Sequence, residues 1–190
     1  MTFNTNPLFM GNAIAAIHKT LRAELFAVSA LLSHPAAGID EIISKLAEIR
    51  QLLNTHSHQE DSALESLLRD YDPAMANRME DDHLKFGAQL QQLCAQASTA
   101  QALPEHRHCE LIERLYLDWN RFVGEYLLHL DLEERVLLPA LMRQLSPVES
   151  LACTLLMQAP PTRREWLGTG GAHAGRVAPS NGSLSLEMSR

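Results

Sequence analysis

A hydrophobic repeat with a period of 3.5 residues is the strongest constraint on what this chain can fold into. In four segments, over about residues 12–32, 40–69, 73–97 and 104–139, apolar side chains follow one another at alternating steps of four and three. Such a seam packs long α-helices side by side. No alternating strand pattern accompanies it. The sequence therefore predicts an all-α fold, an antiparallel up-down-up-down four-helix bundle.

Turn and cap residues separate the four segments. Asp40 is a plausible N-cap for the second helix, and Asp72-Pro73 combines a cap with proline at the first helical position of the third. The polar stretch Gln96 to Leu103 is expected to be a loop. Pro104 is then expected to open the fourth helix, whose seam runs from Ile112 to Val136.

The C-terminal part of the chain differs from the bundle in composition. Ser146-Pro147-Val148-Glu149 forms a capping box, which predicts a short fifth helix. From Gly168 onward, Gly, Ser, Ala and Asn dominate without periodicity, so we expect a disordered tail. The predicted organisation is a bundle over residues 10–145, a short helical extension over 146–167 and a tail over 168–190.

Composition and charge exclude several classes of protein. With 190 residues, 46% of them hydrophobic, the chain suits one soluble domain. A net charge of −7 argues against a nucleic-acid binder, and no apolar run approaches the ~18 residues of a membrane span. The N-terminal residues lack the pattern of a secretory signal, so we expect a cytoplasmic protein. Three widely spaced cysteines read as reduced thiols: Cys94, Cys109 and Cys153.

Six polar residues interrupt the hydrophobic seams in register with the leucines. The second and fourth helices each carry a His-x-x-x-Glu pair, which places both side chains on one helix face a turn apart. Polar groups buried on a seam cost free energy unless something satisfies them. The six residues are His18, His56, Glu60, His83, His129 and Glu133.

A pair of metal ions would satisfy all six groups at once. Imidazole and carboxylate together suit iron, manganese or zinc. Six protein ligands are too many for one tetrahedral zinc ion and too rich in nitrogen for calcium or magnesium. The set suits two metals, each with two histidines and both bridged by Glu60 and Glu133, with positions left open for a small ligand.

Other readings of these and neighbouring residues weaken or limit the metal hypothesis. A single seam histidine is usually a satisfied core residue, and His56 with Glu60 could be a buried ion pair. His58 falls on the polar face and is read as solvated, and Asp81, Asp82 and Glu134 are read as surface acids. Tyr126, one turn before His129, is read as a core aromatic whose hydroxyl reaches a partner; the alternative is a hydrogen bond to the metal site or its ligand.

At these residues the sequence resembles the hemerythrin-like (HHE cation-binding) family. The strongest local match is His129-Leu-Asp-Leu-Glu133-Glu134-Arg-Val-Leu-Leu-Pro139, and His56-Ser-His-Gln-Glu60-Asp is the second motif. His18 and His83 stand where the first-helix and third-helix histidines belong. The resemblance covers roughly residues 10 to 145. It implies a non-haem di-iron centre inside the four-helix bundle.

The resemblance also carries departures. The oxygen carriers of the family have a second histidine on the third helix, where this chain has Met79 and Gly87, and an aspartate five residues after the fourth-helix histidine, where Glu133 follows at four. Four histidines with two glutamates are more similar to bacterial proteins implicated in repairing iron–sulfur centres. Those proteins usually carry a cysteine-containing N-terminal segment, and this chain shows none.

The expected function is therefore that of a di-iron protein that binds, senses or handles oxygen or nitric oxide, or that supplies iron. The alternative is a regulatory or interaction bundle whose site is degenerate or purely structural. A ferritin-like oxidase is less favoured, because that fold expects Glu-x-x-His pairs and more carboxylates. No nucleophile triad accompanies the site, so the sequence leaves turnover open.

Overall fold

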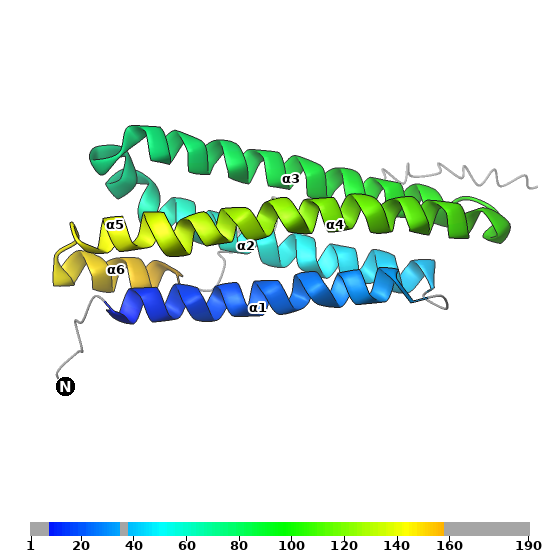
Figure 1. Cartoon of the computed structure of the whole chain (residues 1–190), viewed down its shortest axis with the longest axis horizontal. Helices are drawn as coiled ribbons and strands as arrows, with labels where there is room; N and C mark the ends of the chain where they lie inside the picture. Colours follow the sequence, from blue (N-terminus) through cyan, green and yellow to red (C-terminus); the bar gives the residue numbers. More distant parts are fainter. Residues whose placement is uncertain (1–7, 35–37, 158–190) are drawn as a thin grey trace, which may run out of the picture.

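The computed structural model, which describes residues 8–34 and 38–157, shows an antiparallel four-helix bundle. The helices run alternately up and down along one long axis (Figure 1). The described residues contain no strand, which confirms the predicted all-α class. The four long helices are α1 (Leu8–Leu32), α2 (Ile39–Tyr71), α3 (Pro73–Gln101) and α4 (His108–Leu132).

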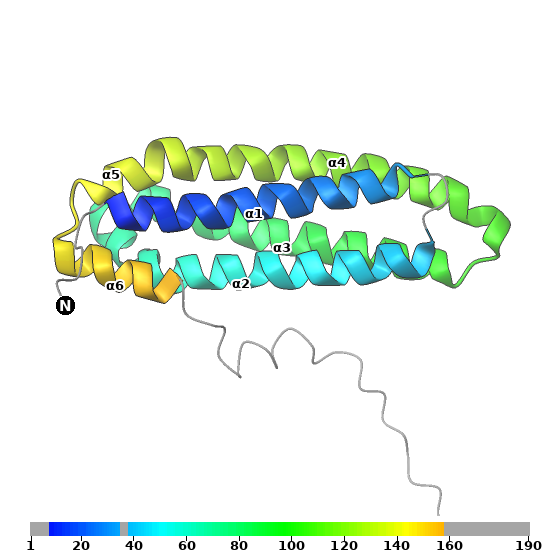
Figure 2. The ribbon, with the colours of Figure 1, turned by 90° about the horizontal axis from the view of Figure 1, so that it is seen from below.

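Shorter elements follow α4 in the chain. A π-helical turn, η2 (Glu133–Leu137), and α5 (Leu138–Met142) prolong α4, and α6 (Pro147–Met157) then folds back against α1 and α2. Figure 2 shows α6 beside these two helices at one end of the bundle. The predicted capping box opens α6: the Glu149 N–H donates to Ser146 Oγ, and the Ser146 N–H donates to Glu149 Oε2. The predicted tail over 168–190 lies outside the described residues.

The hydrophobic seams form the core of the bundle. Every predicted seam position of α1 from Ile14 to Leu32 is buried, and the large side chains of Trp119 and Phe122 fill the centre from α4. The Trp119 indole N–H donates to the Leu25 carbonyl (3.3 Å) and to Ser29 Oγ (3.0 Å). This contact ties α4 to α1, and it satisfies the polar atom that burial of tryptophan brings inside.

Two predicted helix boundaries are wrong. Gly38, not Asp40, is the N-cap of α2; the Asp40 carboxylate lies in the first turn and accepts a hydrogen bond from Gln101 (2.6 Å). Helix α3 continues to Gln101, through most of the segment predicted as a loop. That segment is polar but compatible with a helix, since Ser98 and Thr99 bond the carbonyls one turn back. The helix stops only before Pro104, and a 3₁₀ turn, η1 (Glu105–Arg107), leads into α4.

The π-helical turn changes which face of the chain enters the core. The period of 3.5 predicts that Val136 is buried, but Val136 is exposed and Leu137 is buried. A π turn holds one more residue than an α turn, so it shifts the buried face by one position. In α2 the seam drifts more gently, from the predicted Leu67 to Leu68, as expected for a straight helix of 3.6 residues per turn.

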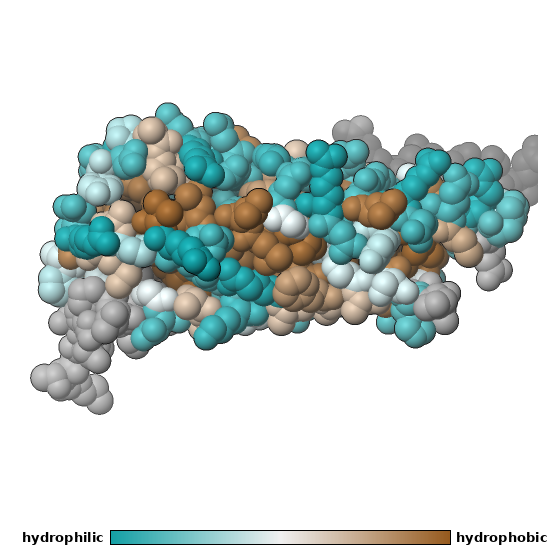
Figure 3. Space-filling view, viewed as in Figure 1, coloured by the Kyte–Doolittle hydropathy of each residue, from teal (hydrophilic) through white to brown (hydrophobic). Residues whose placement is uncertain are grey.

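The outer surface is mostly polar, with apolar side chains among charged ones. Figure 3 shows brown apolar residues along the face that carries α4. Helix α4 itself has exposed leucines, Leu117 and Leu128. Over residues 8–34 and 38–157, no helix combines the length and apolarity needed to cross a bilayer.

The N-cap of α3 offers a test of the fold. Asp72 accepts a hydrogen bond from the Met75 N–H (3.0 Å), as the sequence predicts. Asp72→Ala should lower the free energy of unfolding by about 1 kcal/mol, because the helix loses its cap. Urea unfolding measures the change. The control is Asp70→Ala, which removes an exposed acid from the last turn of α2 and should cost nothing; equal losses in both variants would contradict the capping role.

Candidate metal centre

All six polar seam residues meet at one level of the bundle. His18 comes from α1, His56 and Glu60 from α2, His83 from α3, and His129 and Glu133 from α4 and its π turn. Their donor atoms form two overlapping groups, and within each group these atoms all lie within 4.8 Å of one another. The two glutamates belong to both groups. The first group adds His18 and His56, and the second adds His83 and His129.

The inward-facing atoms lie close together without hydrogen bonds. His129 Nε2 lies 2.9 Å from Glu133 Oε1, and His18 Nε2 lies 3.3 Å from Glu133 Oε2. His56 Nε2 and His83 Nε2 lie 3.4 and 3.5 Å from Glu60 Oε2. Within residues 8–34 and 38–157, none of the four Nε2 atoms has a hydrogen-bond partner, and neither does Glu60 Oε2 or either carboxylate oxygen of Glu133. Buried donors and acceptors are rarely left in this condition unless a further group satisfies them.

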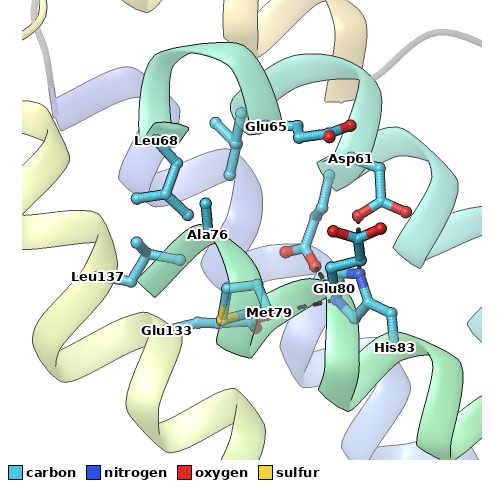
Figure 4. Close-up of a pocket in the computed structure, with 11 residues that line it drawn as sticks. Asp61, Glu65, Leu68, Ala76, Met79, Glu80, His83, Glu133 and Leu137 are labelled. Carbon is cyan, nitrogen blue, oxygen red and sulfur yellow. Dashed lines mark hydrogen bonds and ion pairs between the residues drawn. The ribbon is translucent and has the colours of Figure 1, made fainter. Parts of the chain in front are cut away.

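The outward-facing nitrogens of three histidines do have partners. His18 Nδ1 bonds Glu134 Oε1 (2.9 Å), His83 Nδ1 bonds Asp61 Oδ1 (2.8 Å), and His129 Nδ1 lies 3.4 Å from Asp82 Oδ2. Figure 4 shows the Asp61–His83 contact. An ionised carboxylate only accepts, so each Nδ1 carries the hydrogen. A neutral imidazole held in this way turns the lone pair of Nε2 inward, as a metal ligand requires.

These three carboxylates are the functional residues that the sequence reading missed. Asp82 and Glu134 were predicted to be solvated surface, and Asp61 was not among the candidate site residues. All three are half-buried and bond a histidine of the neighbouring helix. The signal was available, because each carboxylate directly adjoins a predicted site residue: Glu60-Asp61, Asp82-His83 and Glu133-Glu134.

Each of the three carboxylates bonds a histidine of the next helix around the bundle. Asp61 of α2 bonds His83 of α3, Asp82 of α3 bonds His129 of α4, and Glu134 of the π turn after α4 bonds His18 of α1. By the same rule, α1 would supply an acceptor for His56. The residues beside His18 are Ile17 and Lys19, whose side chains cannot accept a hydrogen bond. His56 Nδ1 accordingly has no partner among the described residues.

Two consecutive glutamates of the π-helical turn both serve the centre. Glu133 points into the cluster and is 1% exposed, whereas Glu134 reaches the outer side of His18. The Arg22 guanidinium holds Glu134 by two bonds, of 2.7 and 3.0 Å. Such paired bonds fix the orientation of a carboxylate. Arg22 and His18 of α1 are thereby tied to the end of α4.

Burial opposes charge on both inner carboxylates, yet they respond in opposite directions. The imidazoles of His56 and His18 overcome burial and hold the pKa of Glu60 well below its usual range. Burial and the charge of Glu60 raise the pKa of Glu133 well above its usual range. In the metal-free cluster Glu133 therefore holds a proton more readily than Glu60 does.

The imidazoles also differ from one another. Burial lowers the pKa of His56 to about 4, and burial with the nearby His83 lowers that of His129. Burial also opposes charge on His83, but the carboxylates of Asp61 and Glu60 outweigh it and raise the pKa of His83 to about 10. The metal-free cluster thus holds protons where a cation would replace them.

The other residues considered from the sequence behave differently. His58 is exposed, as predicted, and so are His106 and Cys109. Tyr126 is 1% exposed and packs among aromatic rings, as a core aromatic should. Its hydroxyl, however, has no hydrogen-bond partner among the described residues, contrary to the prediction that it reaches one.

A comparison with protein families shows which family this four-helix bundle belongs to. The family model described as Hemerythrin HHE cation binding domain matches residues 11–141. The chain belongs to that family. The matched span contains the four long helices and all six clustered residues. The comparison with curated proteins and the comparison with solved structures each gave no match. Family membership and the convergent cluster agree on a metal-binding site.

The outer carboxylates should govern how tightly a metal is held. Asp61→Ala and Glu134→Ala are each expected to weaken the affinity for a divalent metal by about 10- to 100-fold, because the imidazoles lose their fixed orientation. Competition with a chromophoric chelator measures the affinity. Asp131→Ala is the matched control, since it removes an α4 carboxylate that pairs with the exposed Arg135. Equal affinities in all variants would contradict the orienting role.

Metal binding should release protons. With a pKa of about 10, His83 of the metal-free protein carries a proton that a metal ion must displace, and burial also favours a proton on Glu133. The apparent affinity should therefore rise about tenfold or more per pH unit between about pH 7 and pH 9, as fewer protons compete with the metal. Titration calorimetry in buffers of different ionisation enthalpy counts the released protons. Metal binding without proton release would show that the metal displaces no proton from His83 or Glu133.

Proposed function

We propose that this protein holds a dinuclear iron centre in the middle of its bundle. His18, His56, His83 and His129 are the terminal ligands, and Glu60 and Glu133 are the bridges. The observation that carries the proposal is the set of buried inward-facing atoms without hydrogen bonds, contributed by four helices. A bundle that needed only stability would place leucine at these positions, because unsatisfied polar groups in a core cost free energy.

The donor set supports iron and a pair of ions. Each group offers two imidazoles and two shared carboxylates, a mixture that suits iron, with manganese or zinc as competitors. Two bridging carboxylates offset half of the positive charge of two ferrous ions. Four protein donors per ion leave coordination positions for a small molecule.

The function that this site supports best is the handling of a small diatomic such as oxygen or nitric oxide, or the supply of iron. The metals supply open coordination positions and electrons when bound. The protein supplies the surroundings: the aromatic rings of Phe86 and Tyr126 pack against His129, with ring centroids 5.2 and 5.6 Å away. Asp61, Asp82 and Glu134 orient the imidazoles.

Iron analysis of protein purified without oxygen tests the proposal. The wild-type chain should hold about two irons, with an oxo-to-iron absorption band after oxidation, and the variant His129→Ala with Glu133→Ala should hold none. His58→Ala, an exposed histidine between His56 and Glu60, is the control and should keep its iron. Circular dichroism verifies that all variants remain helical. Full iron retention in the double variant would overturn the ligand assignment.

The same ions should stabilise the fold. A ligand that binds only the folded state raises the free energy of unfolding in proportion to the logarithm of its concentration over its Kd. The melting temperature should therefore rise on loading with ferrous iron and fall on chelation. A melting temperature indifferent to iron would contradict the proposal.

A further inference from the structure

The two halves of the metal centre differ in how closely the protein covers them. The side chains of His18 and His56 are 0% and 2% exposed, whereas that of His83 is 8% exposed. Two hollows between α2 and α3 border His83, and neither is lined by His18, His56 or His129. Within the described part of the chain, free space therefore adjoins the centre at His83, in the half that His83 forms with the 1% exposed His129.

The first hollow leads directly to the shared carboxylates. It has a volume of about 90 Å³, and Glu60, Glu133 and His83 line it together with the apolar side chains of Met79 and Leu137 (Figure 4). Met79 lies one helical turn before His83. Its apolar side chain borders the space next to the centre.

The second hollow lies on the other side of His83. It has a volume of about 480 Å³, and its lining includes Tyr126, Phe86 and Gly87. Gly87 lies one turn after His83, and a Cβ atom added there would meet no atom within 4 Å. Asp61, Glu80 and His83 line both hollows. The Asp61–His83 hydrogen bond thus lies between the two spaces.

The Tyr126 hydroxyl is a polar group that lines the second hollow and has no hydrogen-bond partner among the described residues. The side chain is buried. A tyrosine hydroxyl can donate one hydrogen bond, so it can donate to a molecule that enters the second hollow, which Tyr126 lines.

We propose that an exogenous ligand of the centre binds on the side of His83 and His129, reaches it from the hollows between α2 and α3, and accepts a hydrogen bond from the Tyr126 hydroxyl. This inference rests on the proposed function. The ligand class follows from the lining. Apolar walls such as Leu53 and Leu64 favour a small, uncharged or singly charged molecule with an acceptor atom.

Azide binding to the oxidised, iron-loaded protein tests the hydrogen bond. Tyr126→Phe should weaken azide binding about five- to tenfold, the usual effect of losing one hydrogen bond. The azide stretching frequency should shift between H₂O and D₂O in the wild type and not in this variant, a difference that a packing role would not produce. The exposed Tyr71→Phe is the control. Tyr126→Phe removes only a hydroxyl without a partner, so its fold and iron content should be unchanged.

Two matched glycine variants test the route. Gly87→Leu narrows the second hollow and should slow azide binding, whereas Gly124→Leu, at an equally open but more exposed helix position, should leave it unchanged. Iron-loaded Tyr126→Phe and Gly87→Leu that bind azide as the wild type does would overturn this inference alone. A wild-type chain that binds no iron would overturn the proposed function, and this inference with it.

Discussion

The buried cluster of imidazoles and carboxylates is the constraint on which the rest of the structure depends. Polar atoms that face one another in a core without hydrogen bonds destabilise a bundle that would otherwise be held by leucine packing. The surrounding structure limits that cost in two ways. Carboxylates from neighbouring helices bond the outer sides of three rings, and protons divide unequally between Glu60 and Glu133.

Packing and electrostatics divide the centre into unlike halves. On the side of α1, His18 is fully enclosed and is held through Glu134 by Arg22. On the side of α3, His83 borders free space and pairs with a half-buried aspartate. The symmetric ligand set of two histidines per group therefore sits in asymmetric surroundings. We place small-molecule access on one half of the site for this reason.

Periodicity predicted most of the fold, because a buried seam of leucines leaves few arrangements for four long helices. It also predicted which six polar residues converge, since each replaces a leucine in register. The prediction failed for the polar segment Gln96 to Gln101, which was expected to be a loop. This segment is helical, and its serine and threonine side chains donate hydrogen bonds to the helix backbone. The π turn that exposes Val136 leaves no mark that a fixed period can detect.

The outer carboxylates were harder to predict than the inner residues. A residue adjacent to a seam position points about 100° away from it, so Asp61, Asp82 and Glu134 look like surface acids on a single helix. Only the position of the next helix shows that such an acid has a buried partner. The gap at His56 illustrates the same limit, since it depends on Ile17 and Lys19 of another helix.

Adjacent pairs such as Glu60-Asp61, Asp82-His83 and Glu133-Glu134 have a consequence for how the helices align. One member of each pair faces the bundle axis, and the other forms a hydrogen bond with a histidine of the adjoining helix. Shifting any of these helices by one heptad would still pack leucine against leucine, but it would move both members of such a pair away from their partners. The polar residues of the centre thus also specify the register in which the four helices pack.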